Sequence, residues 1–162
     1  MAKNPDPMLE LTTSRGVTRT LDDWSTMFQL CCVVLPGRPE AAAWIPVAQK
    51  IFATFGDSDC TCAYVVAGPA EVARRLLGPA ERDEITFVDP DHALVTSLGL
   101  ERLPAFVALR QDTSVVAAAE GWNPSEWHSV AKEIARAQKW TTPELTGRGM
   151  PPKTEGWPLA TA

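Results

Sequence analysis

The stretch GLERLPAFVALRQD, residues 99–112, decides the fold. A glycine and a Leu-Pro pair precede an alternating apolar run, and polar residues typical of a turn end that run. The segment that follows, SVVAAA at 114–119, is again apolar, so the two runs predict a β-hairpin with its turn near residues 111–114. The Leu103-Pro104 pair therefore stands at the entry to this hairpin.

Strand-like and helix-like segments alternate upstream of the hairpin. Continuous apolar runs at 29–35 and 60–68 are typical of strands buried on both faces of a mainly parallel sheet, and a third short strand is expected at 85–88. The expected helices are 39–55 with a kink at Pro46, 69–78, 91–99 and a last helix capped by Asn123. This alternation predicts an α/β fold with a central mixed sheet flanked by helices.

Composition predicts one soluble domain with two irregular ends. The chain has 162 residues, 45% of them hydrophobic and 22% charged, with a net charge of −5. An acidic balance argues against nucleic acid or an anionic membrane as partner, and the absence of a signal-like segment leads us to expect a cytoplasmic protein. We divide the chain into an N-terminal extension at 1–8, a domain at 9–140 and a Pro/Gly-rich tail at 141–162, which is either disordered or draped over the domain.

Three stretches, taken in their order and spacing, resemble the thioredoxin-like superfamily, in particular its peroxiredoxin and TlpA-like branch. LTTSRGVTRTLDDW at 11–24 is similar to the opening strand, glycine turn, second strand and acidic helix start of that branch. TFVDPDHALVTSLGL at 86–100 is similar to its strand, Asp-Pro-Asp turn and helix, and the hairpin described above looks like its cis-proline strand and the strand after it. The resemblance covers about residues 9–138 and implies a thioredoxin-like fold in which Pro104 follows a cis peptide bond.

The cysteines that this family uses are absent from their usual positions. In thioredoxins a helix proline follows the first cysteine of Cys-x-x-Cys by eight residues, and taking Pro46 as that proline places the two cysteine positions at Arg38 and Ala41. The peroxiredoxin motif Pro-x-x-x-Thr-x-x-Cys is absent as well. Dithiol exchange needs an exposed thiolate of low pKa at a helix N-terminus. The chain is therefore not expected to be an enzyme of the family's usual kind.

Four cysteines remain, as the pairs Cys31-Cys32 and Cys60-Thr61-Cys62. Alternation along a strand directs the first two to opposite faces and Cys60 and Cys62 to one face. Such residues are commonly buried as small apolar side chains. Two alternatives stay open: a redox pair that joins Cys31 or Cys32 to Cys60 or Cys62 across neighbouring strands, and a zinc site. We expect neither a bound metal nor a cofactor.

The resemblance implies a redox-inactive protein that binds another protein, as a chaperone-like module or an assembly factor. The expected binding surface is the family's former active-site region together with the tail, and consists of Arg38, Arg102, Leu103, Pro104 and Trp157. The alternative is a thiol oxidoreductase or antioxidant protein that serves cell redox homeostasis through its displaced cysteines. A third option is a small-molecule binder that uses Arg38 and Arg102 as a cationic lip.

Overall fold

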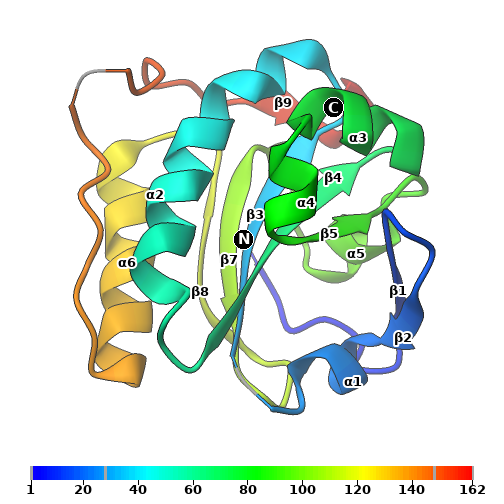
Figure 1. Cartoon of the computed structure of the whole chain (residues 1–162), viewed down its shortest axis with the longest axis horizontal. Coiled ribbons are helices and arrows are strands. Elements are labelled where there is room, and N and C mark those ends of the chain that lie inside the picture. Colours follow the sequence, from blue (N-terminus) through cyan, green and yellow to red (C-terminus); the bar gives the residue numbers. More distant parts are fainter. Residues whose placement is uncertain (1, 28, 148, 162) are drawn as a thin grey trace.

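A mixed sheet forms the centre of the computed structural model, which describes residues 2–27, 29–147 and 149–161 (Figure 1). Its seven strands lie in the order β2-β1-β5-β4-β3-β7-β8. The central strands β3, β4 and β5 are parallel, whereas β7 runs antiparallel to β3. The strands are β1 (Glu10–Thr13), β2 (Thr18–Thr20), β3 (Gln29–Pro36), β4 (Cys60–Ala67), β5 (Ile85–Val88), β7 (Ala105–Leu109) and β8 (Val115–Glu120). The predicted α/β architecture with a central mixed sheet is thus confirmed.

Helices cover both faces of this sheet. One face packs against α2 (Ile45–Phe55), α3 (Ala70–Leu77) and α6 (Pro124–Gln138), and the other face packs against α1 (Leu21–Ser25) and α5 (Ala93–Ser97). Figure 1 shows α2 and α6 side by side, to the left of β7 and β3. A short helix that the sequence did not predict, α4 (Ala80–Asp83), joins α3 to β5. Among the described residues no helix combines the length and the apolar character that a bilayer crossing needs.

The predicted helix 39–55 is divided near its proline. A 3-10 helix, η1 (Pro39–Trp44), ends where α2 begins at Ile45. Pro46 lies in the first turn of α2, where its missing N–H costs no helical hydrogen bond. The expected kink is therefore a change from one helix type to another.

Burial of both faces explains the continuous apolar runs. Along β3, Cys31, Val33 and Leu35 belong to the core under α2 and α6, whereas Leu30, Cys32 and Val34 belong to the core under α1 and α5. Each fully buried side chain of this size stabilises the fold by roughly 1.5–3 kcal/mol. A strand in this position cannot alternate between apolar and polar residues, because neither of its faces meets water.

The tail packs along the domain, which is the second of the two arrangements that the sequence left open. Strand β9 (Trp157–Pro158), followed by the 3-10 helix η2 (Leu159–Thr161), pairs antiparallel with β6 (Arg102–Leu103), and Thr154 forms a β-bridge with Trp122. Leu145 is fully buried. Gly156 has a positive φ, and a Cβ atom there would clash with the backbone carbonyl of Leu103. Only glycine allows the tail to approach the domain so closely.

Candidate functional site

Three of the four cysteines converge near the start of the central strands. In the parallel pairing of β3 and β4, Cys31 lies opposite Cys62, and Cys60 lies two residues earlier on the same face of β4. Their sulfur atoms all lie within 4.8 Å of one another. The predicted shared face of Cys60 and Cys62 is confirmed. We call Cys31, Cys60 and Cys62 the thiol cluster.

Cys32 does not take part in the cluster. As the alternation predicted, its side chain points to the opposite face of β3 and packs in the core under α1 and α5. Burial and, to a smaller extent, the charge of Cys62 raise the pKa of its thiol to about 12. Cys32 is therefore a small apolar side chain, and it provides a matched control for the other three.

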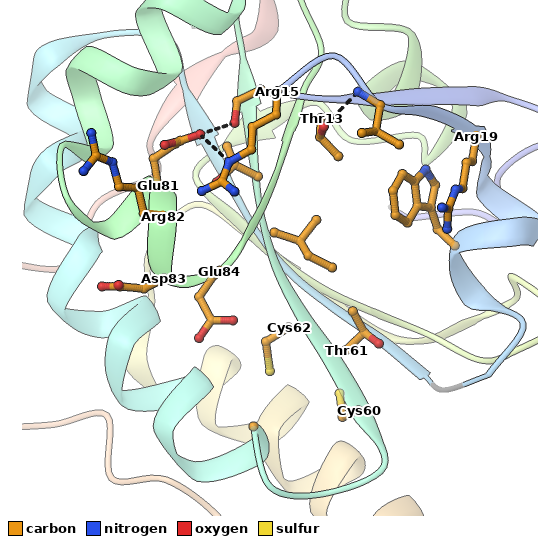
Figure 2. Close-up of a pocket in the computed structure, with 16 residues that line it drawn as sticks. Thr13, Arg15, Arg19, Cys60, Thr61, Cys62, Glu81, Arg82, Asp83 and Glu84 are labelled. Atoms are coloured by element: carbon orange, nitrogen blue, oxygen red, sulfur yellow. Dashed lines mark hydrogen bonds and ion pairs between the residues drawn. The ribbon is translucent and has the colours of Figure 1, made fainter.

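The thiol cluster borders a cavity of about 580 Å³. The cavity lies between the β1–β2 hairpin, the start of β4 and the segment from α4 to β5 (Figure 2). Cys60 and Cys62 line it, with 7% and 6% of their surface exposed, whereas Cys31 is fully buried behind them. A reagent in the cavity can thus approach Cys60 and Cys62. The sulfur atom of Cys31 lies behind them, within 4.8 Å of both of their sulfur atoms.

Mutual hydrogen bonds give the three thiols different acidities. The thiols of Cys31 and Cys62 hydrogen-bond to Cys60 and lower its pKa to about 5, against the opposing effect of burial. Hydrogen bonds to Cys60 and Cys62, followed by burial, raise the pKa of Cys31 well above its usual value. Its hydrogen bond with Cys31 alone would lower the pKa of Cys62, but the bond to Cys60 and burial outweigh it and raise this pKa to about 12. Of the three thiols, Cys60 is therefore the one that loses its proton first.

Glu84 adds an acid–base group beside the cluster. It immediately precedes β5, and the pairing of Ala63 with Ile85 places it level with Cys62 on the neighbouring strand. Figure 2 shows the Glu84 carboxyl group and the Cys62 side chain in the same part of the cavity. Burial, then the charges of Cys62 and Asp83, raise the pKa of Glu84 to about 7. Glu84 can therefore accept or release a proton near neutral pH.

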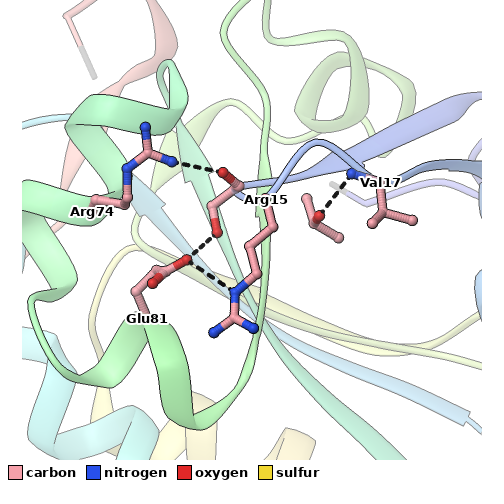
Figure 3. Close-up of polar contacts among 6 residues, drawn as sticks. Arg15, Val17, Arg74 and Glu81 are labelled. Atoms are coloured by element: carbon pink, nitrogen blue, oxygen red, sulfur yellow. Dashed lines mark hydrogen bonds and ion pairs between the residues drawn. The ribbon is translucent and has the colours of Figure 1, made fainter.

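Polar contacts hold the far wall of the cavity in place (Figure 3). Glu81 on α4 is buried, accepts a hydrogen bond from the Ser14 hydroxyl and lies 3.9 Å from Nε of Arg15. Nη1 of Arg74 donates to the Ser14 carbonyl oxygen at 2.7 Å. Inside the hairpin, the Val17 amide donates to the Thr13 hydroxyl at 3.1 Å. These bonds tie the turn of the β1–β2 hairpin to α3 and α4, so this wall keeps its shape.

The expected binding surface is assembled, but the tail of the chain covers it. The Leu103–Pro104 peptide bond is cis, and Leu103 pairs with Trp157 of β9. The guanidinium of Arg102 donates to the carbonyl oxygens of Glu155 and Gly156 at 2.9 and 3.0 Å. Arg38 lies 4.5 Å from the centre of the Trp157 ring and pairs with Glu40 at 3.1 Å. Both guanidinium groups are thus engaged with neighbouring residues of the chain, and the cationic lip of Arg38 and Arg102 stays a prediction.

The thiol cluster is also the group that could hold a metal ion. Three sulfur ligands suit a thiophilic ion, but structural zinc sites take four protein ligands, and this group has three members among the described residues. The expectation that no metal binds stays a prediction.

Sequence reasoning missed Glu84 and the cavity. The notable signal was the position of Glu84 directly before a predicted strand. Its nearness to Cys62 depends on the register between β4 and β5, which no local pattern specifies.

Comparison with known proteins identifies the fold through solved structures. A scan against protein-family models finds no match, and a search of the curated proteins finds none either. A secreted disulfide oxidoreductase of Mycobacterium tuberculosis aligns with a TM-score of 0.60 and 14% identity, over 80% of this chain and 96% of that one. The thioredoxin domain of a thiol-disulfide oxidoreductase of Bacteroides vulgatus gives 0.64 and 12%, over 83% and 98%. Peroxiredoxin Q of Xanthomonas campestris gives 0.65 and 16%, over 80% and 91%.

These findings correct the main functional prediction. The expectation of a redox-inactive binding module is wrong, because the structures that share this fold are thiol-disulfide oxidoreductases and peroxiredoxins. That expectation rested on Arg38 and Ala41, where the family's cysteines are absent. The alternative that joined Cys31 or Cys32 to Cys60 or Cys62 across neighbouring strands agrees better with the structure, in which Cys31, Cys60 and Cys62 lie together near the other end of the same strands.

Proposed function

The chain has a thioredoxin-like fold of the peroxiredoxin and TlpA-like branch, and from this premise we propose that it is a thiol oxidoreductase that works through Cys31, Cys60 and Cys62. One observation carries the proposal: three sulfur atoms lie within 4.8 Å of one another, and two of them line a cavity. A dithiol of this kind can exchange with a disulfide without any cofactor. The names of the solved structures with this fold support the same class of chemistry.

The first step uses the thiolate at the cavity wall. The sulfur of Cys60 attacks one sulfur of a substrate disulfide RSSR, so a Cys60–SR bond forms, the substrate S–S bond breaks and RS⁻ leaves. The lowered pKa of Cys60 supplies the thiolate at neutral pH. The neighbouring thiols, which hydrogen-bond to Cys60, stabilise its charge until the substrate arrives.

The second step transfers the disulfide into the protein. The sulfur of Cys62 attacks the Cys60 sulfur, the second RS⁻ leaves, and the proton of the attacking thiol passes to Glu84 or to the departing thiolate. Exchange with Cys31 then places the disulfide between Cys31 and Cys62, which lie opposite one another on adjacent strands. Strands in a sheet are about 4.8 Å apart, within the range of Cα separations that disulfides allow. In sum, RSSR takes up two electrons to become two RSH, and two protein thiols become one disulfide.

Thiol counting tests this function directly. The reduced protein is exposed to bis(2-hydroxyethyl) disulfide, unfolded, and titrated for free thiols, and the disulfide is mapped by mass spectrometry of peptides. We expect the native chain and the matched control Cys32→Ser each to lose two thiols to a Cys31–Cys62 disulfide. Cys31→Ser should retain the disulfide as Cys60–Cys62, and Cys62→Ser, which lacks the thiol that attacks Cys60, should accumulate the mixed disulfide on Cys60. A native chain that keeps all four thiols, or a disulfide that involves Cys32, would overturn the proposal.

The cellular setting forms part of the proposal. A cytoplasmic location agrees with four free cysteines, which a reducing compartment maintains. A protein partner, and the absence of nucleic-acid or membrane binding, stay predictions from the acidic composition and the tail.

A further inference from the structure

We infer that the cavity beside the thiol cluster selects small disulfides that carry a carboxylate group. The inference rests on the proposed function and adds to it the class of substrate. It draws on the size of the cavity and on the guanidinium groups that the β1–β2 hairpin contributes to it.

The size of the cavity limits the substrate to small molecules. Its volume of about 580 Å³ lies within the range of sites that bind small ligands. Only 7% of Cys60 and 6% of Cys62 are exposed, and both residues line the cavity. A disulfide on the surface of a folded protein cannot bring its sulfur atoms to these thiols, whereas a free disulfide of a few carbon atoms on each side can enter.

Cationic groups lie on the hairpin side of the cavity. Arg19 of β2 lies 4.9 Å from the centre of the Trp24 ring, and within the described parts of the chain no carboxylate pairs with it. Arg15, in the turn of the hairpin, has its Nε atom 3.9 Å from the Glu81 carboxylate and keeps 66% of its side chain exposed. Figure 2 shows the Arg15 guanidinium turned toward Glu81 and the Arg19 guanidinium on the opposite side of the cavity from Glu84. A substrate carboxylate can thus pair with Arg19 while the disulfide reaches the thiols.

The acidic groups of the cavity lie on its other side. Glu81, Asp83 and Glu84 come from α4 and the residue after it, and Arg82 lies between them in the sequence. Glu81 is engaged by Ser14 and Arg15. Arg82 thus stands among the carboxylates of α4, whereas the hairpin contributes Arg15 and Arg19 and no carboxylate to the lining. The hairpin side therefore favours the carboxylate of a substrate.

Apolar side chains complete the lining of the cavity. Val17, Trp24 and Ile85 add the apolar surface against which the methylene groups of a small disulfide can pack.

Three disulfides of similar size test the inference. Dithiodipropionate has two carboxylates, bis(2-hydroxyethyl) disulfide is neutral, and cystamine has two ammonium groups. Each rate of thiol loss from the reduced protein is divided by the rate of the same disulfide with 2-mercaptoethanol, an uncharged thiol, which removes differences in the intrinsic reactivity of the disulfides. We expect the normalised rate to be about fivefold higher for the dicarboxylate than for the neutral disulfide, and lowest for cystamine.

Matched arginine variants locate the effect. Arg19→Gln should lower the normalised rate for dithiodipropionate about fivefold and leave that for the neutral disulfide unchanged. Arg75→Gln, on the exposed side of α3 and outside the cavity, should change neither rate. Equal normalised rates for the three disulfides in the native chain, or equal effects of the two variants, would overturn the inference and leave the proposed function standing. No thiol loss with any disulfide would overturn the proposed function itself.

Discussion

The two ends of β3 differ in what they keep of the family's chemistry. Beyond its C-terminal end lie Arg38, the cis Pro104 and Trp157, which form the surface where the resemblance places a redox motif, but no cysteine stands there and the tail covers it. Near its N-terminal end Cys31 meets Cys60 and Cys62 at an open cavity. The two places are separated by five residues of extended strand, about 17 Å. In this chain the fold therefore gathers three thiols at the end of the central strands opposite to Arg38 and Pro104.

The largest expected effect separates the two ends by their chemistry. Cys31→Ser should change the disulfide of the oxidised chain from Cys31–Cys62 to Cys60–Cys62, because it removes the thiol opposite Cys62 that takes part in the final exchange. Arg38→Ala, at the other end of β3, should leave both the yield and the rate of disulfide formation unchanged. Peptide mapping after oxidation measures both. Oxidation that depends on Arg38 would reverse the comparison.

The pH dependence of alkylation should also distinguish the thiol end. Since the pKa of Cys60 is lowered to about 5, its thiolate and its reaction with iodoacetamide should persist on acidification down to that pH. Cys62→Ser retains a hydroxyl donor and should shift the midpoint less than Cys62→Ala, which removes the donor and raises the midpoint toward an ordinary thiol. If Cys60 of the native chain reacts with the pH midpoint of an ordinary thiol, the lowered pKa of Cys60 is contradicted.

The C-terminal end of β3, which the tail covers, should contribute to the stability of the fold and not to the reactions of the thiols. Trp157 packs edge-on against Trp44, with 5.7 Å between the ring centres, and the Arg38 guanidinium lies over its ring. Trp157→Ala should therefore lower the free energy of unfolding by about 2 kcal/mol, which is less than the loss for a fully buried tryptophan. Urea denaturation measures this loss. The rate of thiol loss to a neutral disulfide should stay the same, and a large change in that rate would show that the two ends are coupled.

The smallest effect concerns Glu84. Because its pKa is raised to about 7, the folded state holds a proton there that the unfolded chain releases at lower pH, so stability falls as pH rises through about 7. Glu84→Gln should remove this loss, and its melting temperature should change less than that of the native chain between pH 5 and 8. Asp83→Asn, at the neighbouring residue, should keep most of the dependence. If the melting temperatures of the native chain and of Glu84→Gln depend on pH in the same way, Glu84 is not the source of this pH dependence.

Local sequence patterns predicted the strands and helices but not the contacts between distant segments. The strands at 29–36, 60–67 and 85–88 follow from apolar runs bounded by glycine and proline, and the hairpin follows from the alternation after Pro104. The short helix α4 and the two-residue strands β6 and β9 carry too few residues for any period to show. The position of the tail depends on contacts between residues more than fifty positions apart, such as Arg102 with Glu155.

The sequence by itself determined that this chain folds as a thioredoxin-like α/β domain and that Cys31 and Cys32 face opposite sides of a buried strand, because side chains alternate along any strand. Only the tertiary structure decided which cysteines meet. The parallel register of β3 and β4 places Cys31 against Cys62, the register of β4 and β5 brings Glu84 beside them, and the tail closes the other end. Register and docking are set by the packing of the whole core, so no single stretch of residues contains them.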